Sequence, residues 1–332
     1  MTTTQDAREL LGSDFEKYRQ TLSVAIQSPE PYLEAINRYV LGGRSKEIRP
    51  VVCLLAARCC GKLSYANYCC AAASEMLHTA TLIHDDVADQ ATMRRGAPSI
   101  AAMFGPAAAV LTGDFWLSRS LHLLAKHCSP EIIDCFAESV KKMSEGELLQ
   151  LDKADKLDTT EEDYFTIIYG KTAALFVAAV KSAALAVGAD EKSTEALVGY
   201  AENLGLAFQI RDDIFDYSPD IQTGKVAGAD VKERKITLPL IGALKNAPSK
   251  APAILSRIGQ IESVFMKEVT EAEAKIIADT TAFVRENGGL EYAQARLEKH
   301  TVLAKEALEK IQPSKDREML SAIAEYVGRR LT

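Results

Sequence analysis

The chain has 332 residues, of which 47% are hydrophobic and 26% are charged, and its formal net charge is −7. A chain of this length can bury a substantial core, as one large domain or as two ordinary ones. The acidic balance argues against nucleic acid as a partner, because nucleic-acid-binding proteins present clustered positive charge. No secretory signal is recognisable at the start, and the apolar stretches are interrupted well short of the ~20 residues of a membrane span.

The seven cysteines include two adjacent pairs, Cys59–Cys60 and Cys69–Cys70, which cannot easily form a regular disulfide framework. We therefore expect a reduced, cytoplasmic protein without an integral membrane segment, in which the cysteines are small buried core residues. Alanine-rich stretches recur, aromatic residues make up only 7% of the chain, and strict two-residue alternation is hard to find. These features favour an all-α protein.

The first predicted helices are separated by proline and glycine. A helical pattern begins near Asp14, pauses at residues 28–31, and resumes until the stop at Gly42 and Gly43. Pro50 marks the first turn of the next helix, where its missing N–H is tolerated. From there two long helices, divided near a glycine, extend to the first acidic motif described below.

Loops and further helices alternate toward the C-terminus. Glycine and proline place a loop at residues 91–99, and polar or glycine-rich composition predicts the two main loops, 154–163 and 218–233. Helices are predicted at about 106–127, 130–152, 161–187, 191–217 and 235–245, with several more beyond. Because no composition break or repeat marks a boundary, we expect one large helical domain over residues 1–332.

Two aspartate triplets with the pattern D-D-x-x-D stand in apolar, helix-forming segments. The first consists of Asp85, Asp86 and Asp89, and the second of Asp212, Asp213 and Asp216. The outer members of each triplet share a helix face, where like charges destabilise an isolated helix by roughly 0.2–0.5 kcal/mol. Carboxylate oxygens suit a hard cation such as Mg2+, whose coordination is completed by water and substrate phosphates. The pattern predicts a diphosphate clamp; the alternative is two solvated acidic helix faces.

Basic and amide side chains accompany both triplets. Those near the first are Lys46, Arg49, His78, Arg94 and Arg95, and those near the second are Lys171, Thr172, Gln209, Lys225 and Lys235. Arginine forks and lysine point charges are usual phosphate ligands. Each of them alone is more often a solvated surface charge, but together they suit two diphosphate groups. One group would be held through metal ions and the other by cations alone.

Over about residues 30–330 the chain resembles the trans-isoprenyl (polyprenyl) diphosphate synthases. HTATLIHDDVAD…MRRGAPS resembles the first aspartate-rich motif of that family, and FQIRDDIFDY…TGK…D…KITLPL resembles the second. The resemblance implies the all-α isoprenoid synthase fold, an antiparallel helical bundle around a deep central cavity, as a homodimer. It also implies an Mg2+-dependent prenyltransferase of isoprenoid biosynthesis, which condenses isopentenyl diphosphate head-to-tail with an allylic diphosphate.

The resemblance also implies roles for individual residues. Mg2+, three ions with substrate bound, would be held by Asp85, Asp86, Asp89, Asp212, Asp213 and Asp216. The allylic diphosphate would be contacted by Arg94, Lys171, Thr172, Gln209, Lys225 and Lys235. Isopentenyl diphosphate would be bound by Lys46, Arg49, His78 and Arg95. Catalysis would rest on Asp85, Asp86, Asp89, Lys171 and Asp212.

The sequence departs from the family pattern at two positions. Glu47 replaces an arginine of the usual G-G-K-R-x-R-P, and Arg234 stands where glycine commonly precedes the lysine of K-x-T-L-P. Neither residue is a predicted metal ligand. The first change raises the question of how the predicted isopentenyl diphosphate site is arranged.

Product length is predicted from Ala80 and Thr81, which lie about 7.5 Å and about 6 Å before Asp85 along the helix. In the family an aromatic residue at one of these positions blocks the growing tail, whereas both residues are small here. The first motif also has no two-residue insertion. We therefore expect a product longer than C20, limited by bulky residues of the helix around 115–124. The alternative is a geranylgeranyl or farnesyl diphosphate synthase.

Three other functions remain open at this point. A class I terpene cyclase shares the fold and one aspartate motif, but usually carries a second site of the N/D-x-x-S/T-x-x-x-E type. A non-catalytic subunit of a heteromeric prenyl synthase typically loses aspartates or cations, and the metal-binding set is complete here. A purely structural helical protein would have no need of the matched triplets.

Overall fold

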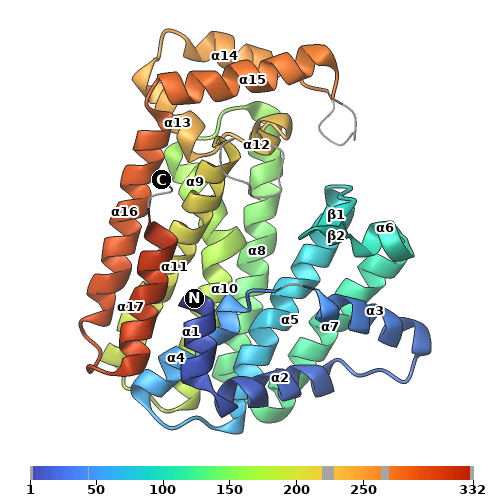
Figure 1. Cartoon of the computed structure of the whole chain (residues 1–332), viewed down its shortest axis with the longest axis vertical. Coiled ribbons are helices and arrows are strands. Elements are labelled where there is room, and N and C mark those ends of the chain that lie inside the picture. Colours follow the sequence, from blue (N-terminus) through green and yellow to red (C-terminus); the bar gives the residue numbers. More distant parts are fainter. Residues whose placement is uncertain (1–2, 44, 219–227, 263–268, 330–332) are drawn as a thin grey trace. The chain divides into compact units, whose positions relative to one another are not determined.

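The computed structural model describes residues 3–43, 45–218, 228–262 and 269–329, and the regular structure among them is almost entirely helical (Figure 1). The first helices are α1 (Thr3–Leu11), α2 (Ser13–Ala25), α3 (Pro31–Gly42), α4 (Ile48–Cys60), α5 (Tyr65–Ala88), α6 (Ile100–Phe104) and α7 (Pro106–His127). The middle ones are α8 (Pro130–Lys156), α9 (Glu161–Ile168), the π-helical turn η1 (Tyr169–Ala173), α10 (Ala174–Ala186) and α11 (Glu191–Asp216). The last are α12 (Ala229–Lys232), α13 (Leu238–Asn246), α14 (Ala251–Ile258), α15 (Glu271–Glu286), α16 (Gly289–Leu308) and α17 (Lys315–Gly328). The expected all-α class is confirmed.

The long helices begin and end close to their predicted limits, whereas the short elements were missed. α7 has the predicted bounds, and the break between α4 and α5 falls at the expected glycine. The nine-residue α1 and the five-residue α6 were not predicted. The predicted loop at 91–99 contains a small antiparallel hairpin of β1 (Met93–Arg94) and β2 (Ala97–Pro98).

Contacts group the chain into two compact units, which are described separately below. The first comprises Met1–Lys141, Leu175–Ala201 and Ala304–Tyr326, and the second comprises Lys142–Ala174, Glu202–Leu303 and Val327–Thr332. The first aspartate triplet belongs to the first unit, and the second triplet belongs to the second. The expectation of one domain over 1–332 stays a prediction.

In the first unit, α5 carries the first triplet and packs along α7, with further contacts to α4 and α2 (Figure 1). Small side chains make this packing close. A Cβ atom on Gly113 of α7 would lie 2.2 Å from Nε2 of His84 on α5, which glycine alone avoids. α5 begins with a cap in which Asn67 Oδ1 accepts the Ser64 N–H at 2.8 Å. The triplet therefore lies at the far end of a helix that is fixed along its length.

In the second unit, the wide turn η1 interrupts one long helical stretch. It packs against α8, where a Cβ atom on Gly170 would lie 2.5 Å from the carbonyl oxygen of Lys142. α9 begins with a capping box, in which Thr160 N–H donates to Asp163 Oδ2 at 2.9 Å and the Asp163 N–H donates to Thr160 Oγ1 at 3.1 Å. Single π turns inside α-helices are frequent at functional sites.

One helical stretch of the described chain, Glu161–Ala186, is long and apolar enough to cross a membrane. The sequence led us to expect every apolar stretch to be interrupted well short of a membrane span, and this stretch is an exception. Because 78% of its apolar window is buried inside the protein, the stretch has the character of a core helix. All seven cysteines are free thiols. Cys53, Cys69 and Cys70 are buried as expected, whereas Cys59, Cys60, Cys128 and Cys135 are only partly buried.

Candidate active site

The first triplet lies at the C-terminal end of α5. The N–H of Asp89 donates to the carbonyl oxygen of Asp85 at 2.8 Å, so the helical turn continues through the motif and the two residues are one turn apart. Asp89 is exposed and Asp85 is half-buried. The middle residue, Asp86, is turned inward and only 3% exposed. The triplet thus presents two accessible carboxylates and one internal carboxylate.

The hairpin after α5 brings a predicted arginine back to the triplet. Its two turn residues, Arg95 (φ 53°) and Gly96 (φ 82°), are both left-handed, as two-residue hairpin turns of the type I′ require. From β1, Arg94 Nε donates to Asp86 Oδ1 at 2.8 Å, and its Nη2 contacts the same oxygen. A charge-assisted pair of this kind compensates the buried Asp86 carboxylate.

The two predicted cations before the triplet differ in exposure. Lys46 is exposed. Arg49, in the first turn of α4, is only 7% exposed, and its guanidinium carbon lies 4.7 Å from the ring centroid of Phe176. A cation over an aromatic face is held in place by the ring's negative surface. Arg49 is therefore a fixed charge and Lys46 a freely solvated one.

His78 of α5 lies among the predicted arginines. Burial, and then the positive charges of Arg49, Arg95 and Arg94, hold the pKa of its imidazole well below the usual value. His78 is therefore neutral at pH 7. Three residues of the predicted isopentenyl diphosphate site, Arg49, His78 and Arg95, therefore lie close enough to interact electrostatically, together with Arg94 of the predicted allylic site.

Glu75 belongs to the same group and was missed by the sequence analysis. It is buried, and its Oε1 accepts the Ser45 Oγ–H at 2.7 Å. Burial raises the pKa of this carboxyl, while Ser45 and the nearby Arg49 and Arg95 lower it by less. The available signal was its position three residues before His78, on the same face of one helix.

A cavity of about 1350 Å³ adjoins these residues in the first unit. Its polar lining includes Arg19, Glu47, Glu75, Asp86, Arg94 and Arg95. From α5 the apolar lining includes Leu82 and Ile83, but the cavity is not lined by Ala80 or Thr81. Ala80 is only 2% exposed, and Thr81 Oγ–H donates to the carbonyl oxygen of His78 at 2.9 Å. Neither predicted chain-length residue lines this cavity, although their sequence neighbours Thr79 and Leu82 do.

In the second unit, the middle aspartate is the end of a hydrogen-bonded chain. Thr172 Oγ–H donates to Gln209 Oε1 at 2.7 Å, and Gln209 Nε2 donates to Asp213 Oδ1 at 2.9 Å. The hydroxyl of Tyr164 donates to Asp213 Oδ2 at 2.7 Å. Thr172 and Gln209 were predicted and are brought together with the triplet, whereas Tyr164 was missed.

The carboxyl of Asp213 is neutralised more easily than an ordinary aspartate. Burial raises its pKa to about 7; the hydrogen bonds from Tyr164 and Gln209 lower it by less, and the charge of Asp212 raises it further. Asp212 itself is 40% exposed at its side chain. The second triplet therefore also combines an accessible carboxylate with an internal one.

The remaining predicted residues of the second unit lie around the hydrogen bonds that join Thr172, Gln209 and Asp213. The wide turn η1 presents Lys171, whose Nζ lies 3.0 Å from Glu147 Oε2. Asp216 accepts the backbone N–H groups of Ala229 at 3.1 Å and Asp230 at 3.0 Å, which ties the end of α11 to the start of α12. Lys225 lies outside the described residues.

A small cavity of about 70 Å³ connects several of these groups. Its polar lining includes Tyr164, Lys171, Gln209, Asp213, Asp230 and Lys235. Burial, with the charges of Asp213 and Asp216, raises the pKa of Asp230 well above its usual value. Asp230 was not named as a site residue, although it lies in the motif run that carried the family resemblance.

Arg234, the second departure from the family pattern, lies beside the site and not in it. Its backbone is left-handed at φ 56°, a conformation that favours the glycine usual at this position. Its guanidinium donates to the carbonyl oxygens of Ile261 at 2.8 Å and Gly259 at 3.1 Å. These contacts hold an arginine in a backbone conformation where glycine would cost less.

The donor set of both triplets fits Mg2+. All donors are carboxylate oxygens, and in the described ranges no three histidine, cysteine or acidic side chains converge as a ready metal cage. Mg2+ commonly binds through one or two protein carboxylates and completes its octahedron with waters and substrate phosphates. The accessible Asp85 and Asp212 suit this incomplete mode of binding.

Comparison with known proteins identifies the family of the chain. Residues 30–276 match the family model of the polyprenyl synthetases. The chain is 34% identical over 327 residues to the octaprenyl diphosphate synthase of Haemophilus influenzae, covering 98% of this chain and 96% of that protein. Two crystal structures, each 32% identical and each covering 98% of both chains, are similar. They are a decaprenyl diphosphate synthase from Rhodobacter capsulatus (TM-score 0.90) and a polyprenyl synthase from Caulobacter crescentus complexed with calcium and isoprenyl diphosphate (TM-score 0.88). The chain belongs to the polyprenyl synthetase family and is a prenyltransferase.

Proposed function

We propose that this protein is an Mg2+-dependent trans-polyprenyl diphosphate synthase, which extends an allylic diphosphate with isopentenyl diphosphate to a product longer than C20. One observation carries the proposal. A buried carboxyl, Asp213, is held by neutral donors at a cavity that Lys171 and Lys235 also line. This arrangement supports a site in which a bound cation, together with Lys171 and Lys235, neutralises an anionic diphosphate substrate.

In the proposed reaction, the bond between C1 of the allylic substrate and its diphosphate oxygen breaks first. Lys171, Lys235 and Gln209 contact the departing pyrophosphate and stabilise its growing negative charge. The six aspartates would hold Mg2+, which when bound supplies further neutralisation of that diphosphate. The hydrogen bonds from Tyr164 and Gln209 fix the direction of the Asp213 carboxyl.

The second substrate, isopentenyl diphosphate, binds in this proposal among Lys46, Arg49, His78 and Arg95. Arg49 and Arg95 provide positive charge, and the neutral His78 adds a hydrogen-bond donor. The double bond of isopentenyl diphosphate forms the new C–C bond with C1 of the allylic cation. The proton released from C2 then passes to the pyrophosphate, so no dedicated side-chain base is needed.

Two of the similar proteins above are named octaprenyl and decaprenyl diphosphate synthase. These names and the small side chains of Ala80 and Thr81 support a long product here. The homodimer, the cytoplasmic location and the number of three Mg2+ ions stay predictions.

The test is incubation of the purified protein with Mg2+, labelled isopentenyl diphosphate, and geranyl, farnesyl or geranylgeranyl diphosphate as primer. Mass spectrometry of the dephosphorylated products gives their length, and EDTA provides the metal-free control. We expect polyprenols longer than C20 and no product with EDTA. Cyclic hydrocarbons from the primer alone would instead indicate a terpene cyclase, and no consumption of either substrate would indicate a non-catalytic subunit.

A further inference from the structure

The residue that departs from the family in the isopentenyl diphosphate region, Glu47, is buried and fully engaged. Only 6% of the Glu47 residue is exposed. The carboxylate accepts the hydroxyl of Tyr18 at 3.0 Å and lies 3.1 Å from Arg8 Nη2 and 3.4 Å from Arg19 Nε. A buried carboxylate between two guanidinium groups is compensated, whereas an arginine there would be the third positive charge.

The partners of Glu47 come from the two N-terminal helices. Arg8 belongs to α1, and Tyr18 and Arg19 belong to α2. Both guanidinium groups also lie over the ring of Phe15, at 5.2 Å for Arg8 and 5.7 Å for Arg19. The aromatic ring and the carboxylate thus fix the two arginines together.

The same contacts hold the main chain that carries Lys46. Arg8 Nη2 donates to the carbonyl oxygens of Ser45 at 3.1 Å and Lys46 at 2.8 Å. In addition, Ser45 Oγ–H donates to Glu75, and Ser45 Oγ accepts the N–H of Glu47 at 3.3 Å. The segment 45–47 is therefore held from α1 and from α5.

Backbone strain at Glu47 also indicates that surrounding contacts hold this segment in place. Its φ of 48° and ψ of 39° are left-handed, a conformation that glutamate adopts rarely. Residues in such conformations persist when their surroundings determine them, and they cluster at functional sites. Here the determinants are the contacts to α1 and α2, and the next helical turn carries Arg49.

We propose that Glu47 is a positioning residue, through which α1 and α2 fix the segment bearing Lys46 and Arg49 for isopentenyl diphosphate. The inference rests on the proposed function above. In this chain the N-terminal helices become part of the second substrate's site, and Arg8 and Arg19 compensate the lost family arginine. No contact between Glu47 and substrate is required.

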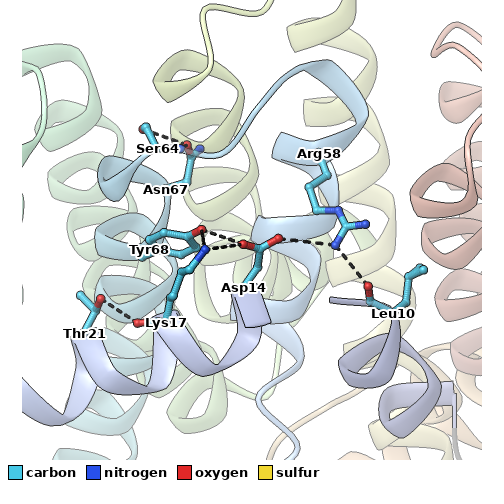
Figure 2. Close-up of polar contacts among 8 residues, drawn as sticks. All are labelled: Leu10, Asp14, Lys17, Thr21, Arg58, Ser64, Asn67 and Tyr68. Atoms are coloured by element: carbon cyan, nitrogen blue, oxygen red, sulfur yellow. Dashed lines mark hydrogen bonds and ion pairs between the residues drawn. The ribbon is translucent and has the colours of Figure 1, made fainter. Parts of the chain in front are cut away.

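A matched control exists, because α1 and α2 have a second anchor that leaves residues 45–49 untouched. Figure 2 shows it: Arg58 of α4 donates to the carbonyl oxygen of Leu10 at 3.2 Å and lies 3.6 Å from Asp14 Oδ2. Asp14 Oδ1 in turn accepts the hydroxyl of Tyr68 at 2.7 Å, and Lys17 contacts both. Arg58→Ala loosens the same helices and also removes the ion pair of Arg58 Nε with Asp316 Oδ1 at 3.1 Å, but it removes no contact to residues 45–47.

The experiment compares Glu47→Gln, Arg8→Ala and Arg58→Ala in steady-state kinetics with each substrate varied. We expect the first two variants to raise the KM for isopentenyl diphosphate about 10–100-fold, the scale of a small misplacement. The KM for the allylic substrate and kcat should stay within about twofold, and Arg58→Ala should behave as wild type. A charge exchange, Glu47→Arg with Arg8→Glu, should recover most of the loss caused by Glu47→Arg alone.

Hydrogen exchange of the backbone amides of residues 45–49, without substrate, separates this inference from the proposed function. Faster exchange in Glu47→Gln and Arg8→Ala, but not in Arg58→Ala, supports the positioning role even if wild type made no polyprenyl product. The inference is overturned if both KM values rise together, if Arg58→Ala matches Glu47→Gln, or if amide exchange of residues 45–49 is unchanged in Glu47→Gln and Arg8→Ala.

Discussion

The two aspartate triplets share one sequence pattern but lie in different electrostatic surroundings. The internal carboxylate of the first, Asp86, is paired with the guanidinium of Arg94. That of the second, Asp213, accepts hydrogen bonds from a phenol and an amide in the described part of the chain, and burial raises its pKa to about 7. A repeated motif therefore does not imply repeated chemistry. The internal carboxylate of the first triplet has a direct ion pair, whereas that of the second has neutral hydrogen-bond donors and the more distant charge of Lys171.

The largest expected effect tests whether the accessible carboxylates of the two triplets are equally necessary. Asp85→Ala and Asp212→Ala should each reduce kcat by more than the about 10²–10³-fold typical of one oxyanion-stabilising group, because each removes a predicted metal ligand. Circular dichroism should show unchanged helix content. Near-normal turnover of either variant at saturating Mg2+ would refute the metal-clamp interpretation for that triplet.

A second prediction assigns one substrate to each region. Lys46→Ala or Arg49→Ala should raise the KM for isopentenyl diphosphate about 10–100-fold, as expected for lost charge-assisted contacts worth ~1.5–3 kcal/mol each. The KM for the allylic diphosphate should hardly change.

Lys171→Ala, in the second region, provides the reciprocal measurement. It should affect turnover and the allylic KM more than the isopentenyl KM. Equal effects of all three variants on both substrates would contradict the division between the regions.

A third prediction concerns pH and applies to the metal-free protein. The pKa of Asp213 rises from 3.8 to about 7 on folding, so the folded state holds an extra proton between these values. Stability from this group is present at low pH and is lost as pH rises through about 7. Asp213→Asn should remove that loss, on the order of 1–4 kcal/mol at pH 8 and less at pH 5.

Thermal unfolding in EDTA at several pH values measures this difference. Asp86→Asn is the matched control in the first triplet, and it should destabilise because it leaves Arg94 without its charged partner. A pH-independent difference between wild type and Asp213→Asn would contradict the electrostatic contrast between the triplets.

The smallest effect on rate, and the clearest on product, is expected at Ala80. Ala80→Phe should shorten the product to C15–C20 without abolishing condensation. Because Ala80 is only 2% exposed, the substitution also risks overpacking at a cost of about 1–3 kcal/mol. Thr81→Phe, at a half-buried position, tests the same level of the helix with less strain. A wild-type product of C15 or C20 that neither variant shortens would refute this account of length.

The sequence was informative wherever the signal is local. Helix periodicity, proline and glycine located α7 and the break before α5, and the spacing of each triplet located its outer carboxylates one turn apart. The contacts that distinguish the two triplets were not predictable in this way. Tyr164 lies 49 residues from Asp213 in the sequence, and its hydroxyl can donate a hydrogen bond to that carboxylate only because their two helices pack together.

Glu47 illustrates the same limit in the other direction. From the sequence it was a lost arginine, because no local pattern connects it with Arg8 and Arg19. The structure makes it a buried, compensated carboxylate. The meaning of a departure from a motif depended on residues outside that motif.

The wide turn η1 has a geometric consequence for the second triplet. Tyr164 and Thr172 are separated by eight residues, which in a regular α-helix at about 100° per residue would leave them about 80° apart. A π turn absorbs one extra residue, so the pair behaves as if separated by seven and is only about 20° out of phase. Both side chains therefore take part in the series of hydrogen bonds that includes Gln209 and Asp213. The extra residue in this stretch thus keeps the Tyr164 hydroxyl, which binds Asp213 directly, in phase with the Thr172 hydroxyl, which reaches Asp213 through Gln209.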